Sequence, residues 1–563
     1  MKQLVECVPN ISEGRDKLKI QTIASVVETV EGVRLLDVDP GASTNRTVIT
    51  FVGEPGPVCE AAFRLVKKAS DLIDMSKHKG EHPRMGATDV CPLIPIAGIS
   101  MEETAVYAKK LGERIGKELN IPVYLYENAA SNAKRKNLAY CRSGEYEGLD
   151  KLSSEEFKPD FGPTSFSGSV KQTGATAVSA RDFLVAYNVN LNSTSTRRAN
   201  AIAFDIREAG RIKKNKGITG EVITDTSEEP ERIPGSLKAV KGIGWYIEEY
   251  GIAQLSLNLT NISITPVHIA FDEACKKALE RGIRVTGSEL VGLIPMKSML
   301  DAADYFLDKQ QRSKGISEEE KIKIAVKSLG LDDLAPFNPR KKIIEYLIED
   351  MDAKLLVHMN LTAFAQETAS ESPAPGGGSI SAYVGTLGVS LATMVANLSA
   401  HKRGWDSRWE EFSEWAEKGQ KHLNELLHLV DEDTAAFNKI MDAFQLPKGT
   451  SEEQAARTRA ITDATTYAIE VPLRVMKVCY ESMDVIHAMA AKGNPNSITD
   501  AGVGALCART GVMGAFMNVK INCAEHPDKA YVKKILEEGR SIQAAAMTKE
   551  DEVRKLVEEK IGV

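Results

Sequence analysis

The stretch Ala253-Gln254-Leu255-Ser256-Leu257-Asn258-Leu259 alternates apolar and polar residues without interruption. A period of two residues is typical of a β-strand with one buried face. The β-prone segment 237–247 precedes it and is expected to be its neighbouring strand. The surrounding chain predicts a strand at 183–190, helices at 195–209 and 266–281, and a strand at 283–287. The resulting order, β-α-β-β-α-β, is that of a ferredoxin-like subdomain.

A similar order of elements occupies the beginning of the chain. The apolar patterns predict strands at 3–9, 33–39, 46–52 and 90–96, separated by amphipathic helices. A further strand is expected at 122–126, where the sequence reads Pro-Val-Tyr-Leu-Tyr. We therefore expect two related ferredoxin-like α/β subdomains, at residues 1–178 and 179–330.

After residue 355 the strand patterns end and amphipathic helices take over. These helices are predicted at 360–370, 379–402, 406–445, 451–490, 498–522 and 529–560. The predicted fold class is therefore α/β plus all-α, with a linker at 331–355 and a helical domain at 356–563. The apolar run 380–398 is long enough to suggest a membrane span. Its Ser, Thr, Gly and Ala content instead favours a tightly packed core helix.

The composition is that of a globular protein and excludes several classes of function. The 563 residues include 71 Lys and Arg against 78 Asp and Glu, and the net charge of -7 argues against a nucleic-acid partner. The eight cysteines are scattered without a CxxC pair, so we expect reduced thiols and neither a disulfide framework nor a zinc site. The N-terminus has no apparent signal peptide. A cytoplasmic protein is therefore expected.

The segment 77–89, Lys-His-Lys-Gly-Glu-His-Pro-Arg-Met-Gly-Ala-Thr-Asp, concentrates residues that carry protons and charges. Its glycines and Pro83 interrupt regular structure, which predicts a loop. His78 and His82 have side chains suited to proton transfer near neutral pH. The alternative is a solvated polar loop without a function.

Four other segments are candidates for ligand binding. Ala-Pro-Gly-Gly-Gly-Ser at 374–379 precedes an apolar helix and offers free backbone N–H groups, although a flexible turn capped by Ser379 is an equal alternative. Asp433 lies among apolar residues of its predicted helix, where a carboxylate is costly unless it is paired or functional. Asn518 is suited to contact a heterocycle or to cap another helix. The hydroxyl-rich segment 162–169 is either a ligand loop between subdomains or a plain linker.

Several motifs together resemble a known enzyme family. The segments at 5–10, 36–39, 43–48, 80–87, 122–126, 159–163 and 242–246 resemble glutamate formiminotransferase. The segments Ala-Pro-Gly-Gly-Gly-Ser at 374–379 and Gly-Ala-Phe-Met-Asn-Val at 514–519 resemble the cyclodeaminase domain. The whole chain is therefore similar to the bifunctional formiminotransferase-cyclodeaminases of histidine breakdown.

This resemblance implies two consecutive reactions. The first moves a formimino group from N-formimino-L-glutamate to tetrahydrofolate, and the second closes the ring to 5,10-methenyltetrahydrofolate with release of ammonia. It also implies polyglutamylated tetrahydrofolate as a substrate, no metal, no membrane span and a homo-oligomer formed through the helical domain. The family's catalytic histidine corresponds to His82, and its cyclodeaminase proton donor to Asp433. The substrate-binding residues expected by motif or chemistry are Asp39, Arg84, Tyr126, Gly162, Pro163, Thr164, Ser165, Phe166, Gly174, Gly376, Gly377, Gly378, Ser379 and Asn518.

The chain departs from the family pattern at two places. The loop 167–174 is longer than in animal members, and Glu289 stands where those members have Gln. Two alternatives remain at this stage. In the first, only the transferase is active and the helical domain serves for oligomerisation. In the second, the protein binds folate without catalysis. The presence of both His82 and Asp433 argues against loss of catalysis.

Overall fold

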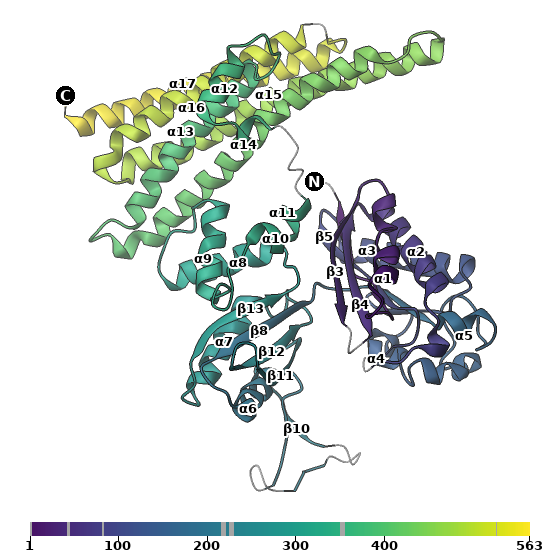
Figure 1. Ribbon diagram of the computed structural model, residues 1–563. Coiled ribbons are helices and arrows are strands. Elements are labelled where there is room, and N and C mark those ends of the chain that lie inside the picture. Colours follow the sequence, from purple (N-terminus) through teal and green to yellow (C-terminus); the bar gives the residue numbers. More distant parts are fainter. Residues whose placement is uncertain are drawn as a thin grey trace. The chain divides into compact units, whose positions relative to one another are not determined.

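The computed structural model describes residues 3–41, 45–80, 84–215, 221–224, 230–348, 355–524 and 526–562. His82 lies outside these described residues. The chain forms two compact units, of which the first contains residues 1–298 and 329–349 and the second residues 299–328 and 350–563. The first unit holds the β-sheets and the second is helical, which confirms the predicted α/β and all-α regions (Figure 1).

The first sheet is assembled around a strand that is interrupted at Val8 and Pro9. Its two halves, β1 (Leu4–Cys7) and β2 (Asn10–Ile11), both pair with β4 (Arg46–Gly53) and β5 (Thr88–Ala97) in antiparallel fashion. β3 (Val33–Gly41) forms one edge beside β4. On the other side, β7 (Thr176–Ala180) and β6 (Val123–Glu127) extend the sheet in parallel. Val178, the predicted subdomain boundary, lies inside β7.

Three amphipathic helices supply the core of this region. They are α1 (Lys17–Ala24), α2 (Pro55–Leu72) and α3 (Met101–Glu118), and their buried residues join those of the sheet in one apolar cluster. α3 begins with a capping box, in which Ser100 and Glu103 each accept a hydrogen bond from the other's backbone N–H. The short helices α4 (Leu138–Cys141) and α5 (Ser169–Thr173) belong to the segment between β6 and β7.

The second sheet consists of four antiparallel strands in the order β11-β12-β8-β13. These strands are β8 (Val185–Leu191), β11 (Val240–Ile247), β12 (Ile252–Leu259) and β13 (Val285–Val291). Helices α6 (Thr196–Ile206) and α7 (Val267–Leu279) complete the order β-α-β-β-α-β. Ala253, Leu255, Leu257 and Leu259 of β12 are buried, as its alternating pattern predicts. Its polar Gln254 is buried as well, because its amide donates a 2.8 Å hydrogen bond to Asn190 Oδ1. The short strands β9 (Arg211–Ile212) and β10 (Arg232–Ile233) pair with each other.

The segment that follows the second sheet is divided between the two units. α8 (Met296–Lys309) and α9 (Glu318–Leu329) lie almost entirely within the second unit. α10 (Pro339–Lys342) and α11 (Ile344–Ile348) belong to the first, where Ile343 forms a parallel bridge with Ile294.

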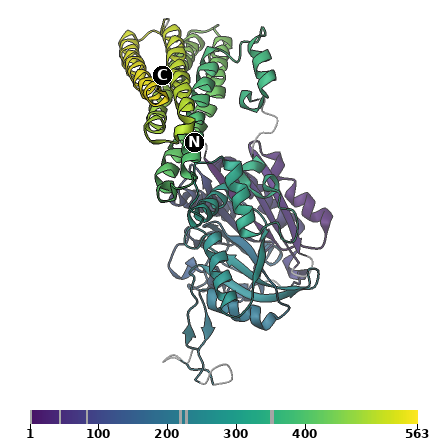
Figure 2. The ribbon, with the colours of Figure 1, turned by 90° about the vertical axis from the view of Figure 1, so that its left-hand side faces the viewer.

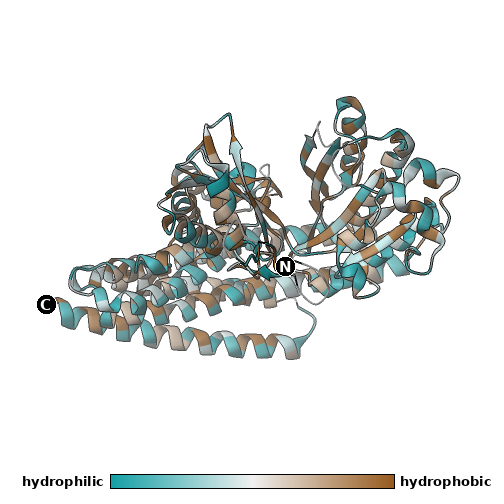
Figure 3. Ribbon diagram, turned by 90° about the horizontal axis from the view of Figure 1, so that it is seen from below, coloured by the Kyte–Doolittle hydropathy of each residue, from teal (hydrophilic) through white to brown (hydrophobic). Residues whose placement is uncertain are grey.

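Long helices lie side by side in the second unit (Figures 1 and 2). They are α13 (Gly377–Ala400), α14 (Trp409–Gln445), α15 (Ser451–Lys492), α16 (Ile498–Cys523) and α17 (Lys529–Ile561), preceded by the short α12 (Leu361–Thr368). Hydrophilic and hydrophobic residues both occur along the long helices of this unit (Figure 3). The apolar faces form a single core cluster.

α13 is the apolar helix that the sequence marks as a possible membrane span. It is long and apolar enough to cross a membrane, but 61% of its most apolar window is buried inside the protein. Its small residues permit close packing, because a Cβ on Gly388 would lie 2.7 Å from the carbonyl oxygen of Gly504 on α16. α13 therefore packs as a core helix of this unit.

Candidate active sites

In the first unit, His78 joins two loops through its imidazole. Its Nε2 lies 3.0 Å from the carbonyl oxygen of Asn45, and its Nδ1 accepts a 3.3 Å hydrogen bond from Arg84 Nε. Because Arg84 can only donate, the proton of a neutral ring belongs on Nε2. Burial lowers the pKa of His78, and the charge of Arg84 lowers it further. His78 is therefore held neutral and fixes the position of Arg84.

Arg84, predicted to hold a substrate carboxylate, already binds two carboxylates of the protein. Its guanidinium donates to both oxygens of Glu147, at 2.8 and 2.9 Å, and to Glu145 at 3.1 Å. The side chain of Arg84 is 11% exposed, whereas that of Glu147 is 65% exposed. Hydrogen bonding of the guanidinium to Glu147, which accepts, is the main reason that the pKa of Arg84 is raised. A carboxylate ligand can thus reach this guanidinium by replacing an exposed glutamate.

Asp89, near the beginning of β5, is a buried carboxylate that the sequence alone does not single out among the charged residues of segment 77–89. One oxygen accepts a 3.0 Å hydrogen bond from the backbone N–H of Met85, and the other accepts from Arg142. Burial raises the pKa of Asp89, and the positive charge of Arg142 opposes this shift. Because Arg142 is 53 residues away, no local sequence pattern predicts this ion pair.

Arg46 lies within electrostatic range of Asp89 and of two predicted substrate-binding residues, Asp39 and Tyr126. Burial lowers its pKa, while the nearby negative groups Asp89 and Asp39 oppose that shift. The phenol of Tyr126 belongs to the same electrostatic surroundings. Tyr126 is buried on β6, which raises its own pKa, whereas Asp39 is exposed on β3. These residues form a polar cluster at the first sheet.

The predicted folate loop contacts the described end of the histidine-containing loop through its last residues, where the Ala87 N–H donates to the Thr173 carbonyl at 2.7 Å. Gly174 forms an antiparallel bridge with Gly86, and a Cβ on Gly174 would lie 2.2 Å from the Met85 carbonyl oxygen. Gly174 also has a positive φ of 66°, which favours glycine. Phe166 packs edge-on against Tyr146 at 5.5 Å, and the Tyr146 N–H donates to the Arg84 carbonyl at 2.9 Å.

The other residues of the predicted folate loop are Gly162, Pro163, Thr164 and Ser165. Gly162 has a φ of 85°, and a Cβ there would lie 2.3 Å from the Ile121 carbonyl oxygen. Pro163, Thr164 and Ser165 follow it, and the Ser165 hydroxyl lies 3.2 Å from that of Ser167. The loop therefore meets the charged cluster through Phe166 and Gly174.

In the second unit, the structure brings Asp433 of α14 to the beginning of α13. Asp433 Oδ2 accepts hydrogen bonds from the backbone N–H of Ser379 at 2.9 Å and from its hydroxyl at 3.2 Å. Gly378 lies directly beside the carboxylate, since a Cβ there would be 2.0 Å from Asp433 Oδ1. Only glycine leaves room for this carboxylate.

Asn518 of α16 lies on the other side of the glycine-rich segment. A Cβ on Gly377 would lie 3.3 Å from its amide nitrogen, and the amide donates a 3.0 Å hydrogen bond to the Gly514 carbonyl. Gly376 is the N-cap residue of α13. Asn522, one turn further, instead donates to the Ala468 carbonyl of α15. The structure thus gathers Gly376, Gly377, Gly378, Ser379, Asp433 and Asn518.

The surroundings of Asp433 favour its protonated form. Burial raises the pKa of this carboxyl, and the two hydrogen bonds from Ser379 oppose the shift without cancelling it. A carboxylic acid of this kind can give a proton to a departing nitrogen.

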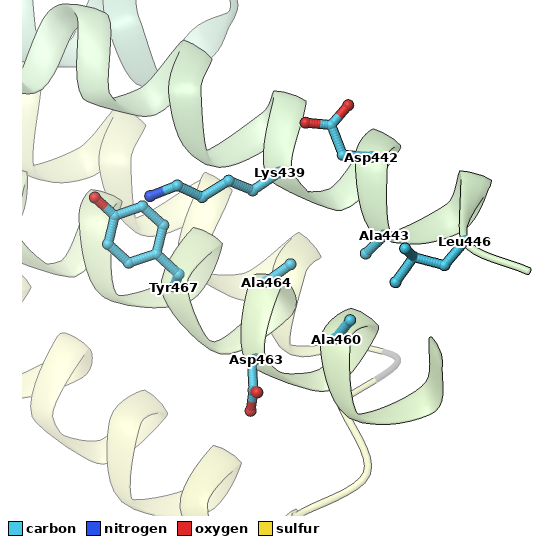
Figure 4. A pocket seen from close by; sticks show the side chains of 8 residues that line it. All are labelled: Lys439, Asp442, Ala443, Leu446, Ala460, Asp463, Ala464 and Tyr467. Atoms are coloured by element: carbon cyan, nitrogen blue, oxygen red, sulfur yellow. The ribbon is translucent and has the colours of Figure 1, made fainter. Parts of the chain in front are cut away.

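A separate pocket opens further along α14, toward α15 (Figure 4). Its volume is about 470 Å³, and the ammonium of Lys439 lies 3.7 Å from the centre of the Tyr467 ring inside it. The pocket contains none of the residues gathered around Asp433. Its lining residues are Lys439, Asp442, Ala443, Leu446, Ala460, Asp463, Ala464 and Tyr467. Within the described parts of the chain, no three His, Cys, Asp or Glu side chains are arranged to hold a metal ion.

Comparison with known proteins covers both units. The model of the formiminotransferase domain, N-terminal subdomain, matches residues 4–181, that of the formiminotransferase domain matches residues 186–349, and that of formiminotransferase-cyclodeaminase matches residues 360–541. A formimidoyltransferase-cyclodeaminase from Mus musculus is 43% identical over 564 residues, covering 99% of this chain and 100% of that protein.

Shorter proteins match parts of this chain. Glutamate formimidoyltransferase from Streptococcus pyogenes serotype M1 is 41% identical and covers 54% of this chain and 94% of its own length. A solved structure of formiminotetrahydrofolate cyclodeaminase from Thermotoga maritima is 27% identical, with a TM-score of 0.33, and covers 36% of this chain and 98% of that one. By the matches along its full length, the chain belongs to the formimidoyltransferase-cyclodeaminase family.

Proposed function

We propose that this protein transfers the formimino group of N-formimino-L-glutamate to tetrahydrofolate and then closes 5-formiminotetrahydrofolate to 5,10-methenyltetrahydrofolate, releasing ammonia. The observation that carries the proposal is the gathering of Gly378, Ser379 and Asp433 in the helical unit of a full-length family member. The substrate would be supplied by histidine degradation.

The transfer step requires a group that moves protons between two nitrogens. N5 of tetrahydrofolate attacks the formimino carbon and loses a proton, and the glutamate nitrogen gains a proton as it leaves. His82 is the proposed acid–base residue, because one imidazole can perform both transfers in turn. Arg84 is proposed to bind the glutamate carboxylate with its planar fork. The hydrogen bonds from Arg84 to both oxygens of Glu147 support this, because they have the geometry with which the fork would bind a substrate carboxylate.

The folate would be held around the same cluster. Asp39 and Tyr126 are proposed to contact its polar edge, with Gly162, Pro163, Thr164, Ser165, Phe166 and Gly174 forming the loop beside it. The packing of Phe166 on Tyr146, next to the Arg84 backbone, supports this assignment. His78 and Asp89 are proposed as positioning residues, because His78 contacts the Asn45 carbonyl and Asp89 accepts a hydrogen bond from Arg142, each in another segment of the chain.

The ring-closing step is assigned to Asp433. N10 adds to the formimino carbon and its proton passes to the imino nitrogen, which becomes an amino group. Asp433 then protonates that amino group, the carbon–nitrogen bond breaks, and ammonia leaves the methenyl cation. The raised pKa of the buried Asp433 supports the role of proton donor. Gly376, Gly377, Gly378, Ser379 and Asn518 are proposed to line this site.

Finer features of the protein belong to the same proposal. We propose that both α/β regions, 1–178 and 179–330, are ferredoxin-like, supported by the strand order β11-β12-β8-β13. The proposal also includes a linker at 331–355 and a cytoplasmic location. It takes polyglutamylated folate as the substrate, with no metal cofactor and no nucleic-acid partner. A homo-oligomer formed through the helical domain is supported by apolar side chains exposed on α13 and α16, namely Leu387, Met394, Leu398, Val503 and Leu506.

Incubation of the purified protein with N-formiminoglutamate and tetrahydrofolate tests the proposal, with the methenyl product followed by its absorbance. Formation of that product supports both steps. In the His82→Ala variant, transfer should fall by roughly 10²–10⁴-fold, while added 5-formiminotetrahydrofolate is still cyclised. Transfer without cyclisation in the unaltered protein would favour the transferase-only alternative, and neither reaction would favour a folate-binding protein.

A further inference from the structure

The contact between α13 and α14 follows a seven-residue repeat. A Cβ on Gly419 would meet Thr393, a Cβ on Gly385 would meet Leu426, and a Cβ on Gly378 would meet Asp433. The α14 positions 419, 426 and 433 are seven residues apart and therefore share one face of the helix. The paired α13 positions run in the opposite direction, so the two helices are antiparallel.

α13 begins beside Asp433, whereas α14 continues past this point along the same seam. α13 begins at Gly377, next to the Asp433 carboxylate, but α14 extends to Gln445. The seam positions beyond Asp433 include Phe437, at i+4, which is 41% exposed. One turn before Asp433, the equivalent residue Val430 has 0% exposure. Because α13 does not extend past Asp433, the large aromatic side chain of Phe437 stays uncovered beside the proposed proton donor.

We propose that Phe437 is the surface on which the bicyclic pterin ring of 5-formiminotetrahydrofolate stacks during ring closure, an assignment that rests on the proposed function. The reacting carbon is attached to N5 of that ring. Asp433 must come within about 3 Å of the leaving nitrogen on the same carbon. Residues at i and i+4 of a helix have Cβ atoms roughly 5–6 Å apart. A ring in reach of Asp433 therefore lies in reach of Phe437.

The chemistry of the two sides of the site agrees with this assignment. Phe437 offers an apolar face, on which flat heterocycles stack well. Gly377 and the amide of Asn518 lie at the N-terminal end of α13 and offer polar groups for the edge of a pterin. The pocket residues Lys439 and Ala443 point from α14 toward α15, and so belong to a different face of the helix (Figure 4).

Phe444 provides a matched control on the same seam. It is 50% exposed and is the same residue type, but it stands eleven positions after Asp433. At about 1.5 Å of rise per residue, it is about 16 Å further along the helix, beyond the reach of a pterin held at Asp433. The guanidinium of Arg457 lies 5.7 Å from the centre of its ring.

The test measures kcat and KM for ring closure of added 5-formiminotetrahydrofolate by the full-length protein. We expect Phe437→Ala to raise KM by about tenfold, the size of one lost stacking contact. Phe437→Tyr should restore KM because it retains the aromatic face. Phe444→Ala should have the KM of the unaltered protein, and formimino transfer should be unchanged in all three variants. Circular dichroism and light scattering establish that each variant folds and keeps its oligomeric state.

Two results would overturn the proposal. One is a KM for Phe437→Ala within twofold of the unaltered value. The other is an equal rise in KM for Phe437→Ala and Phe444→Ala together with a change of molecular mass, which would make the seam a surface for subunit association. Asp433→Asn separates this inference from the proposed function. If that variant still closes the ring, the assigned site itself is wrong; if it does not, a normal Phe437→Ala refutes the stacking surface alone.

Discussion

Ser379 donates two hydrogen bonds to the carboxylate of Asp433, from its backbone N–H at 2.9 Å and from its hydroxyl at 3.2 Å. The two residues are 54 positions apart and belong to different helices. Because the backbone N–H comes from the first turn of α13, the helix dipole also favours a carboxylate there. These contacts oppose the burial that raises the pKa of Asp433. Orientation and acidity of this carboxyl are thus set by the same neighbour.

Gly378→Ala should disable ring closure without unfolding the helical unit. The added Cβ would lie 2.0 Å from Asp433 Oδ1, so the carboxylate must move. A displacement of about 1 Å in a catalytic group can cost roughly 10²-fold in rate. Ring closure should fall by that order while transfer is retained. Gly502→Ala on α16 is the control, since its Cβ would meet Val557 at an ordinary 3.4 Å. Equal ring-closing rates in the two variants would contradict this expectation.

Ser379→Ala should shift the pH profile of ring closure toward higher pH. The proton donor is the acid form of Asp433, so the rate falls as the pH rises through its pKa. The Ser379 hydroxyl stabilises the carboxylate and thereby lowers this pKa, against the larger effect of burial. Removing the hydroxyl should raise the pKa and move the descending limb upward. Profiles of kcat for both proteins provide the measurement, and a shift to lower pH would refute the assignment.

Substitutions of Arg84 and Glu147 should change KM for N-formiminoglutamate in opposite directions. Glu147 occupies the Arg84 fork at 2.8 and 2.9 Å, yet it is mostly exposed, and such pairs contribute little to stability. Glu147→Gln removes a competing carboxylate and should lower KM for N-formiminoglutamate several-fold. Arg84→Lys loses the planar fork and should raise it about tenfold. KM for tetrahydrofolate serves as the internal control. If KM for N-formiminoglutamate is unchanged in Arg84→Lys, Arg84 does not bind this substrate and has only a structural role.

Glu6 should make the stability of the α/β unit fall as the pH rises. Burial on β1 raises its pKa to about 8, against the opposing charge of Arg181. The unfolded chain releases this proton near pH 4.3, so between that pH and about 8 the folded state binds more protons. Unfolding free energy therefore declines across this window by roughly 1 kcal/mol per pH unit and levels off above it. Glu6→Gln should flatten the decline. Thermal unfolding at pH 6, 7 and 8 measures this decline in stability. The same pH dependence of stability in the unaltered protein and in Glu6→Gln would contradict the prediction.

The sequence was sufficient to predict elements that depend on local patterns. The alternation at 253–259 corresponds to β12, Ile252–Leu259, and the helix predicted at 451–490 corresponds to α15, Ser451–Lys492. In α15 a capping box formed by Thr450 and Glu453 marks the beginning of the helix. Such signals lie within a few residues of the boundary that they determine.

Relationships between distant segments could not be predicted in the same way. The amphipathic pattern of α9 does not identify which apolar surface it covers, so its place in the helical unit was not expected. The pairing of Arg142 with Asp89 joins the residue after α4 to β5, and Glu147 reaches Arg84 from 63 positions further along the chain. Asp433 was identifiable because a carboxylate among apolar helix positions is costly. Its partner Ser379 was visible only as a possible N-cap.

The most direct test of two separate activities in one chain is the product mixture formed by Asp433→Asn from N-formiminoglutamate and tetrahydrofolate. Asn retains the size and hydrogen-bonding capacity of Asp but cannot supply the proton. Its neutral side chain also suits the buried position, so the melting temperature should be kept. The account predicts transfer at the unaltered rate and accumulation of 5-formiminotetrahydrofolate, with almost no absorbance from the methenyl product. Methenyl product formed at the unaltered rate would contradict it.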